Sequence, residues 1–394
     1  MLIQEFKVKA KPLQLAAIDD AIRTAQFIQN KALWFWMDNE KVSKFELSKL
    51  CKTLAAEFDF AKELNSMARQ ASAERAWSAI SRFYDDCKKG IKPVGYPKFK
   101  KFARSVESKT SGWKLTGTKR IAFTDKKSIG LLKLVGTHDL AHYPVELIKR
   151  VRLIRRADGY YCQFCIAVDR SEPLEPTGRT TGLDVGLESF YTDSNGHKEP
   201  NPRFYRQSLA KRRTLQRRLA RTKKGSNNRK KAINKLARFD LKVSRKRKDH
   251  AVKLARSVMR SNDLVAYEDL RIKNMVKNHC LAMSINDAGW YQFRQWLERF
   301  GSVFGRVTVA VNPTYTSQQC SSCGAIVKKS LSTRTHACAC GCRLDRDENA
   351  ALNILSAGIR TTGHVGTTLL DRVNASGEMT ATQLDLCLAV QVAS

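Results

Sequence analysis

Residues 315–355 read YTSQQCSSCGAIVKKSLSTRTHACACGCRLDRDENAALNIL, and this stretch decides the fold because it places a cysteine cluster directly before an acidic helix start. The cysteines form two closely spaced pairs separated by fourteen residues, which is the spacing of a zinc ribbon. Four thiolates around one Zn²⁺ leave no open coordination position, so we expect the metal to be structural. The expected ligands are Cys320, Cys323, Cys338 and Cys340.

The second cysteine pair leaves the ligand set partly open. The usual arrangement is C-x-x-C, but here one residue separates Cys338 from Cys340, and both Cys342 and His336 are alternative ligands. Five of the 11 cysteines lie within 320–342, a concentration that favours metal binding over a disulfide framework. The cysteine usage therefore predicts a reducing compartment, and we expect a cytoplasmic protein.

Three acids that are far apart in the sequence have the surroundings that a metal-dependent nuclease requires. Asp184 lies in an expected strand between two glycines, Glu268 ends a second expected strand, and Asp347 begins a helix. Two Mg²⁺ ions about 3.5–4 Å apart need hard anionic oxygen ligands, which these carboxylates supply if folding gathers them. Taken singly, Asp347 is explained equally well as a helix N-cap and Glu268 as a surface carboxylate. The neighbouring Asp345 and Asp269 are alternative choices.

The charge of the chain points to a polyanionic partner. There are 71 Lys and Arg against 37 Asp and Glu in 394 residues, a formal net charge of +34. Such an excess repels itself unless a polyanion neutralises it, and nucleic acid does so while releasing condensed counterions. An anionic membrane surface is the alternative partner. The sequence lacks an apolar run of about 18 residues that could span a bilayer, and we expect no membrane association.

Basic residues are concentrated in one block, 203–260, which contains 23 Lys and Arg and two acids. Apolar residues at helical spacing predict helices there, broken near 223–228. A basic run of this length favours a surface that follows phosphates over a merely solvated face. The residues expected to contact nucleic acid, in this block and after the N-terminal helical region, are Lys98, Lys100, Lys223, Lys224, Arg229, Lys230, Lys231, Arg245, Lys246 and Arg247.

The order of expected elements predicts two larger domains. Short β-like segments over 98–170 are typical of a small antiparallel barrel, with a helical insertion at about 12–90 that includes helices at 13–38 and about 60–88. A Pro-rich stretch at 171–180 marks the boundary, and alternating strands and helices beyond it favour an α/β core. The expected ranges are 1–175 for the barrel with its insertion, 176–317 for the core, 318–343 for the zinc ribbon, 344–358 for a return to the core, and 359–394 for a poorly ordered tail.

A series of motifs occurs in one order along the chain. Two early motifs are AQFIQNKAL at 25–33 and GYPKF at 95–99. The later motifs are GLDVGLESFYTDSNG, KKGSNNRKK, RKRKDHAVKLA, VAYEDLRIKNMVKN, LAMSINDAGW, NPTYTSQQCSSCG and DRDENAALNIL. Together they resemble the transposon-encoded TnpB (OrfB) family, which is related to type V CRISPR effectors. The match is dense from 181 to 358, looser before it, and does not extend beyond about 360.

This resemblance implies a RuvC-like nuclease with a ribonuclease-H fold, interrupted by the zinc ribbon. It implies that Asp184, Glu268 and Asp347 are the three catalytic acids and hold two Mg²⁺ ions. It also implies an N-terminal wedge barrel with a helical recognition insertion that reads a short DNA motif beside the target. Gly341 matches the glycine that follows the last zinc cysteine in the family, which supports Cys340 as a ligand.

The expected function is therefore an RNA-guided, Mg²⁺-dependent DNA endonuclease of a prokaryotic transposon, with one structural Zn²⁺. The expected partners are a transposon-derived guide RNA and double-stranded target DNA, and we expect association with the nucleoid when DNA is bound. The sequence leaves the oligomeric state open. The first alternative is a non-catalytic nucleic-acid-binding regulator of transposition, and the second is a strand-transfer transposase using the same acids. A plain RNA-binding protein explains the charge but leaves the acids unexplained.

Overall fold

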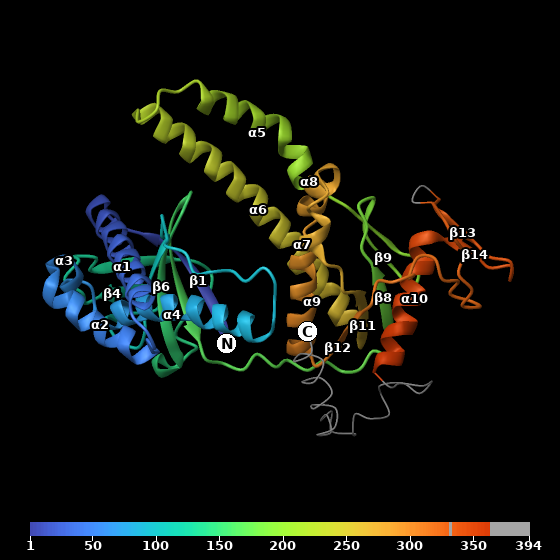
Figure 1. The fold of residues 1–394 in the computed structure, drawn as a ribbon, viewed down its shortest axis with the longest axis horizontal. Helices are drawn as coiled ribbons and strands as arrows, with labels where there is room; N and C mark the ends of the chain where they lie inside the picture. The colour runs from blue at the N-terminus through green and yellow to red at the C-terminus, as the bar shows by residue number, and fades with distance from the viewer. Residues whose placement is uncertain (331–332, 363–394) are drawn as a thin grey trace. The chain divides into compact units, whose positions relative to one another are not determined.

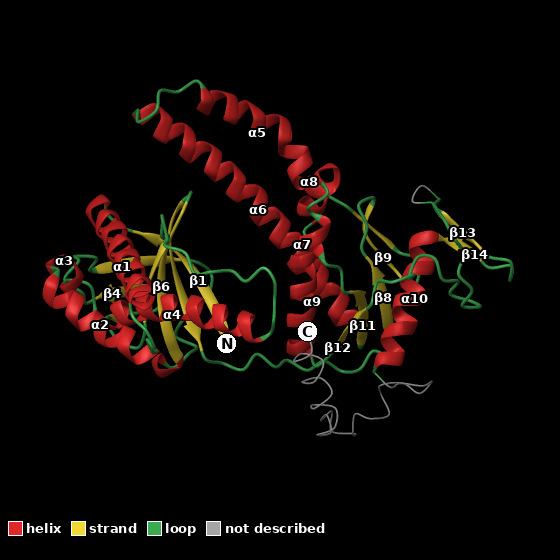
Figure 2. Ribbon diagram, in the orientation of Figure 1, coloured by secondary structure: helices red, strands yellow, loops and turns green. Residues whose placement is uncertain are grey.

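The computed structural model describes residues 1–330 and 333–362, and the chain divides into two compact units. The first unit is Met1–Arg170, and the second begins at Ser171. Each unit contains a sheet with helices packed against it (Figures 1 and 2). Most of the expected tail, from 363 onward, lies outside the described residues. Within the described part of the chain, we find no helix with the length and apolar character needed to cross a bilayer.

The first unit is built on a seven-stranded antiparallel sheet with the order β2-β6-β7-β1-β5-β4-β3. The N-terminal strand β1 lies near its centre, with Phe6 opposite Cys162 of β7 and Lys7 opposite Val135 of β5. Long-range pairing therefore fixes the N-terminus. The strands are β1 (Leu2–Lys9), β2 (Ser105–Ser108), β3 (Trp113–Leu115), β4 (Arg120–Phe123), β5 (Leu131–Val135), β6 (Ile148–Arg156) and β7 (Gly159–Ile166), with a short 3-10 helix at Val145–Leu147.

The helices of the first unit are inserted between β1 and β2. They are α1 (Pro12–Asp38), α2 (Lys44–Glu57), α3 (Asp59–Lys62) and α4 (Ser66–Lys88). Helix α1 begins with Pro12, whose fixed φ suits the first helical position. Helix α2 was not expected, although Ser43 and Glu46 form a capping box at its start and Leu47 is buried. The insertion thus contains one more substantial helix than the sequence analysis predicted.

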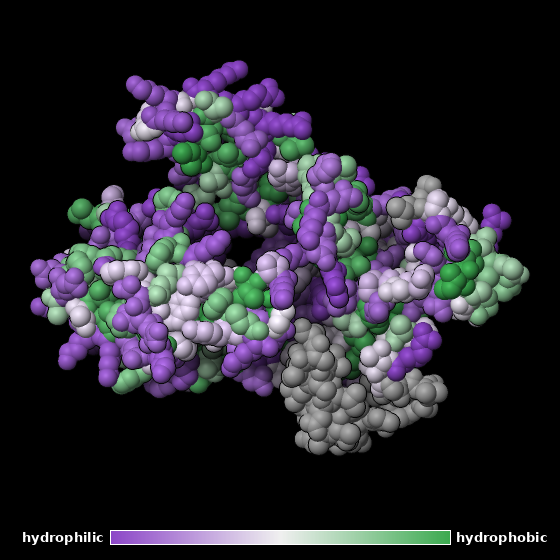
Figure 3. Space-filling view, viewed as in Figure 1, coloured by the Kyte–Doolittle hydropathy of each residue, from purple (hydrophilic) through white to green (hydrophobic). Residues whose placement is uncertain are grey.

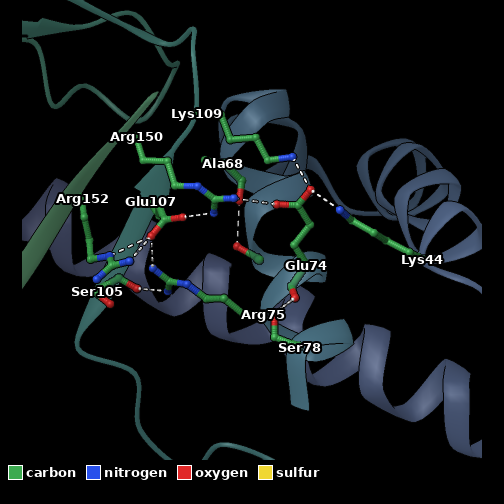
Figure 4. A network of polar contacts seen from close by, with 11 residues as sticks. Lys44, Ala68, Glu74, Arg75, Ser78, Ser105, Glu107, Lys109, Arg150 and Arg152 are labelled. Carbon is green, nitrogen blue, oxygen red and sulfur yellow. Dashed lines mark hydrogen bonds and ion pairs between the residues drawn. The ribbon is translucent and has the colours of Figure 1, made fainter. Parts of the chain in front are cut away.

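A buried carboxylate joins α4 to the sheet (Figure 4). The side chain of Glu107 on β2 is 2% exposed and accepts hydrogen bonds from Arg150 at 2.6 Å, from Arg152 at 2.7 Å and from Arg75 of α4 at 3.4 Å. Burial alone would raise the pKa of Glu107, but Arg150 and Arg152 outweigh it and hold the pKa below its usual value. Removing one partner of such a buried network is costly, so the network fixes the position of α4.

The second unit contains a five-stranded sheet with the order β10-β9-β8-β11-β12. The first three strands in this order are antiparallel, whereas β8, β11 and β12 run parallel. The strands are β8 (Thr180–Asp184), β9 (Ser189–Asp193), β10 (Lys198–Pro200), β11 (Leu264–Glu268) and β12 (Val307–Val311). The Pro-rich stretch before β8 is fixed to this unit, because the buried Asp263 accepts hydrogen bonds from the backbone of Thr177 and Gly178 and pairs with Arg306 at 2.5 Å.

Helices cover both faces of this sheet. On one face, Val265 and Tyr267 of β11 share a hydrophobic core with α6 (Asn227–Ser261) and α9 (Trp290–Phe304). On the other face, Leu264 and Ala266 pack with Ile354 of α10 (Arg346–Thr361). The remaining helices are α5 (Phe204–Ala220), α7 (Ile272–Met275) and α8 (His279–Ala288).

Helix α10 lies unusually close to the sheet. A Cβ at Gly182 of β8 would lie 2.1 Å from the carbonyl oxygen of Ala351, and a Cβ at Gly358 would lie 2.5 Å from the Cβ of Ala266. Glycine is required at both positions because any side chain would separate helix and strand. This packing continues α10 to Thr361, past residue 358, where the core was expected to end.

The basic block forms the α5–α6 pair. The two helices are separated by residues 221–226, where a break was predicted, and Ser226 caps α6 by accepting from Arg229 N. Asp287 of α8 caps α5, because its carboxylate accepts from the amides of Tyr205 and Arg206. Helix α5 has no buried residue, and hydrophilic side chains gather over the pair (Figure 3).

Candidate active site and zinc centre

Two of the expected acids stand at the same edge of the sheet. Asp184 is the last residue of β8 and Glu268 is the last residue of β11. These strands are parallel neighbours, and Leu183 lies opposite Tyr267. The next residue on each strand is an acid, so Asp184 and Glu268 lie side by side. The carboxyl ends of parallel strands are a common location for functional groups, because neighbouring strand ends meet there.

Asp347 reaches this edge from α10. The helix begins at Arg346, so Asp347 lies in its first turn. The close contact between Gly182 and Ala351 holds the helix against β8 and thereby fixes the distance of its first turn from the strand end. The negative charges of Glu268 and Asp347 both act on the carboxyl group of Asp184. Folding therefore gathers all three carboxylates.

The three carboxylates are difficult to ionise together in the metal-free protein. Burial, followed by the charges of Glu268 and Asp347, raises the pKa of Asp184 well above its usual value. Burial also raises the pKa of Glu268, although Thr316 donates a 2.5 Å hydrogen bond to its Oε1. Burial and the charge of Asp345 raise the pKa of Asp347. Divalent cations with oxygen ligands stabilise such mutually repelling carboxylates, so the donor set fits Mg²⁺.

The alternative choices, Asp345 and Asp269, have cationic partners of their own. Asp345 caps α10 by accepting from Asp347 N at 2.9 Å, and it also pairs with Lys198 Nζ at 2.7 Å. Burial would raise the pKa of Asp345, but Lys198 and the helix amides hold it below its usual value. Asp269 pairs with Arg294 and is 59% exposed. Asp345 and Asp269 are thus each held by a close cationic partner, at Lys198 and Arg294 respectively.

Two arginines near the acids were not expected from the sequence. Arg334 lies 3.9 Å from a carboxylate oxygen of Asp347 and 3.0 Å from one of Glu188. The positive charge of Arg346 partly offsets the repulsion at Asp184. The position of Arg346 beside an acid of the motif is a signal that could have identified it. Arg334 has no such signal, because only the folding of the cysteine-rich segment brings it to the acids.

The structure brings the four expected zinc ligands together. The Sγ atoms of Cys320, Cys323, Cys338 and Cys340 all lie within 4.8 Å of one another. Cys320 and Cys340 are 3.7 Å apart, and Cys323 and Cys338 are 3.5 Å apart. A tetrahedral Zn²⁺ with Zn–S bonds of about 2.3 Å requires sulfurs about 3.8 Å apart. The cluster therefore fits a structural zinc ion.

The protonation of these thiols also fits a cation at the centre of the cluster. The Cys323 amide, and less strongly the His336 ring, lowers the pKa of Cys320 to about 5. The Ala325 amide favours the thiolate of Cys323, but the neighbouring sulfurs raise its pKa to about 12. One thiolate thus forms easily, while further thiolates need a positive charge among them, which Zn²⁺ supplies.

The alternative ligands His336 and Cys342 do not belong to the four-sulfur cluster. His336 lies on β13 (Thr335–Ala337), is fully buried, and contacts the ammonium group of Lys329 through Nδ1. Cys342 precedes β14 (Arg343–Asp345) and accepts a 2.9 Å backbone hydrogen bond from Cys338. The short C-x-C pair is therefore compatible with a four-cysteine site.

Two asparagines of α10 connect the cysteine-rich segment to the acids. The buried Asn349 accepts from Ser321 N at 3.0 Å and donates to the Gln319 carbonyl at 2.8 Å. Asn353, one turn later, donates to the carbonyls of Gln319 at 2.7 Å and Thr316 at 2.8 Å. Thr316 also donates a hydrogen bond to Glu268 at the end of β11. One hydrogen-bonded path therefore runs from the first cysteine pair to the acid site. Sequence reasoning missed these asparagines, although they lie in the DRDENAALN motif.

The residues expected to contact nucleic acid fall into two groups. The exposed ones are Lys98, Lys100, Lys223, Lys224, Lys230, Lys231, Arg245 and Lys246. Arg229 and Arg247 are half-buried and bind backbone carbonyls of the protein: Arg229 that of Thr222 at 3.1 Å, and Arg247 that of Asn286 at 2.6 Å. Arg229 thus links α6 to the segment that follows α5, and Arg247 links α6 to α8, while their contact with nucleic acid stays a prediction.

Comparisons with known proteins agree with this arrangement. The family model OrfB_IS605, described as a probable transposase, matches residues 163–279, and a model of the Cas12f1-like TNB domain matches 290–354. A Streptomyces pristinaespiralis protein named putative RNA-guided DNA endonuclease is 30% identical over 379 residues, covering 90% of this chain and 89% of that protein. The Escherichia coli K12 protein named putative RNA-guided DNA endonuclease InsQ is 26% identical and covers 90% and 92%, respectively.

A solved structure of a Cas12f1–sgRNA–target DNA complex has a similar fold. Its protein aligns with a TM-score of 0.55 over 85% of this chain and 81% of that chain, at 16% identity. The similarity to the Streptomyces protein extends over nearly the full length of both chains, which is much more than a shared motif requires. On these grounds the chain belongs to the transposon-encoded TnpB (OrfB) family.

Proposed function

We propose that this protein is an RNA-guided DNA endonuclease whose cutting site consists of Asp184, Glu268 and Asp347. The observation that carries the proposal is the convergence of these carboxylates, which are 84 (268 − 184) and 79 (347 − 268) residues apart in the sequence, at one edge of the sheet. The names of the two relatives that align over most of the chain support the choice of guide RNA and target DNA as partners.

Two Mg²⁺ ions suit this donor set, and the three carboxylates would hold them. Once held there, such ions would supply activation of a water molecule and stabilisation of charge on the leaving 3′ oxygen. The chain itself keeps the ligands in place: Thr316 orients Glu268 through its hydrogen bond, and Asp345 fixes the first turn of α10, which carries Asp347. No side-chain nucleophile is required.

The two units take distinct roles in this proposal. The second unit is a RuvC-like ribonuclease-H core, supported by its sheet of three antiparallel and two further parallel strands, and the zinc ribbon interrupts it before α10. The sheet of the first unit is a wedge barrel, and helices α1–α4 form its recognition insertion. The exposed lysines of the α5–α6 pair hold a transposon-derived guide RNA and its heteroduplex, while base pairing selects the target.

The direct test is the Asp184→Ala variant, assayed for cleavage with Mg²⁺ and with the RNA that co-purifies with the protein, after that RNA has been sequenced. DNA carrying the sequence complementary to this RNA should remain intact, while RNA-dependent DNA binding persists. Asp269→Ala is the matched control because that acid is exposed and pairs with Arg294; it should retain cleavage. Cleavage by the Asp184 variant would reject the site. If the wild-type protein also leaves the DNA intact, the result would favour a non-catalytic regulator.

A further inference from the structure

The segment between α4 and β2 carries two aromatic side chains that the fold leaves in water. Phe102 is 87% exposed, the highest value among the large hydrophobic side chains of the described residues, and Phe99 is 50% exposed. Basic residues alternate with these rings, since Lys98, Lys100 and Lys101 are all exposed. A single exposed ring is common in proteins, so the arrangement of the backbone decides whether the pair has a role.

Helix α1 holds the backbone of this segment in place. Gln26 donates to the carbonyls of Lys100 at 2.7 Å and Lys101 at 3.0 Å, and accepts from Ala103 N at 2.7 Å. Asn30 donates to the Lys100 carbonyl at 2.9 Å and accepts from its amide at 2.8 Å. Both amide side chains therefore use their donor and their acceptor on one short stretch that belongs to no strand or helix.

The ends of the segment are anchored as well. The ring of Tyr96 packs against Trp36 and Phe83, with centroids 5.7 and 5.3 Å away. Pro97 is buried, and on the other side Val106 of β2 enters the core. The exposed rings thus lie on a stretch of backbone that is fixed at its start, middle and end. A fixed segment loses little conformational entropy when a ligand binds to it.

We propose that Phe99 and Phe102 form a stacking platform for unpaired nucleobases, with the neighbouring lysines binding the phosphates. The proposal rests on the proposed function in that it takes nucleic acid as the ligand. Aromatic rings interleaved with basic residues are typical of sites for single strands, because every base offers a π face whatever its sequence. In a duplex these faces are covered by neighbouring base pairs. The platform therefore binds a single-stranded nucleotide rather than a base pair.

Photocross-linking tests the platform at the level of the residue. The full-length protein is mixed with a 20-nucleotide single-stranded RNA containing 5-iodouridine, irradiated, and digested for mass spectrometry. We expect an RNA adduct on Phe102 or Phe99. Phe102→Ala should remove the adduct at residue 102, and Phe102→Trp should retain one there. Phe45→Ala is the matched control because Phe45 is also exposed, at 67%, and also lies beside a lysine, Lys49.

Binding measurements then separate stacking from charge. By fluorescence anisotropy, Phe102→Ala should weaken binding of the same RNA about 5–150-fold, the range for loss of one base stack. The factor should be constant with salt because the ring is uncharged. Lys101→Ala should instead reduce the slope of log affinity against log salt by about 0.7, as expected for one lost phosphate contact.

Two results would overturn the platform. One is adduct formation confined to other segments such as 203–260. The other is an affinity of Phe102→Ala within twofold of the wild type, which would exclude base stacking on that ring. Both measurements are made without Mg²⁺ and without cleavage. Failure of the proposed endonuclease activity is therefore distinguishable, because Asp184→Ala protein should give the same adducts and affinities as the wild type.

Discussion

Adding one methyl group at Gly182 should separate α10 from the sheet. In Gly182→Ala, the new Cβ would lie 2.1 Å from the Ala351 carbonyl oxygen and 2.6 Å from the Leu355 amide nitrogen. Both atoms belong to the helix backbone, so no side-chain rotation relieves the contact. Reaching an ordinary separation of 3.4 Å requires a displacement of about 1.3 Å (3.4 − 2.1).

The displacement has two measurable consequences. Overpacking of this kind costs about 1–3 kcal/mol, which for a unit of this size lowers the melting temperature by about 2–12 °C. Because Asp347 is carried by α10, a shift of about 1 Å should also reduce the cleavage rate about 100-fold. Cleavage is measured at 25 °C, and the melting temperature is measured by differential scanning fluorimetry.

Gly95→Ala is the control for this substitution. A Cβ at Gly95 would meet no atom within 4 Å, so both stability and cleavage should stay unchanged. If Gly182→Ala melts within about 1 °C of the wild type and cuts within twofold of its rate, then the close packing of α10 does not position Asp347.

Three further predictions follow from the site and the basic surface. Asp184→Asn should raise the melting temperature of the metal-free protein at pH 7, because burial and its neighbouring acids raise the pKa of Asp184 in the folded state and its ionised form therefore opposes folding. This gain should shrink as the pH falls and vanish below about pH 3, where the carboxyl is protonated in both folded and unfolded protein; an unchanged melting temperature at pH 7 would contradict it. Asn349→Ala should destabilise the protein by about 1–3 kcal/mol in chemical denaturation, because it leaves the part-buried Ser321 amide without its partner and removes one of the two donors to the Gln319 carbonyl. It should also slow cleavage, and an unchanged rate would show that the path to the zinc ribbon is not needed. Replacing the exposed Lys230 and Lys231 by alanine should reduce the slope of log affinity for single-stranded RNA against log salt by up to about 1.4 (two contacts at about 0.7 each) without lowering the melting temperature; an unchanged slope would exclude them from phosphate contact.

Features that depend on local sequence could be predicted, because the signal lies in adjacent residues. The cysteine spacing indicated four ligands, and the structure brings those four sulfurs together. The acids at 184 and 268 follow apolar strand residues, and the acid at 347 opens a helix, so their common location follows once the strands are parallel neighbours. The break between α5 and α6 was predicted from its Gly, Ser and Asn residues and is confirmed.

Features that depend on tertiary partners could not be predicted in the same way. Arg229 and Arg247 each bind a backbone carbonyl that only folding brings within reach, and their place in a basic block gives no signal of these contacts. Arg334 reaches the acid site because the cysteine-rich segment folds back toward α10. Helix α2 is a different case: its capping residues Ser43 and Glu46 were visible in the sequence, so the missed helix was an error of interpretation.

The position of α10 in the chain has a consequence for protein synthesis. The ribosome completes Asp184 long before it reaches Asp347, which lies 163 residues later (347 − 184). At about 5–20 residues per second, this interval lasts about 8–33 s. During that time a nascent chain has at most two of the three carboxylates, since Glu268 follows Asp184 by 84 residues (268 − 184), and it lacks the helix that covers one face of the sheet. On the proposed function, the acid site is therefore completed only late in translation, and an unfinished polypeptide would lack it.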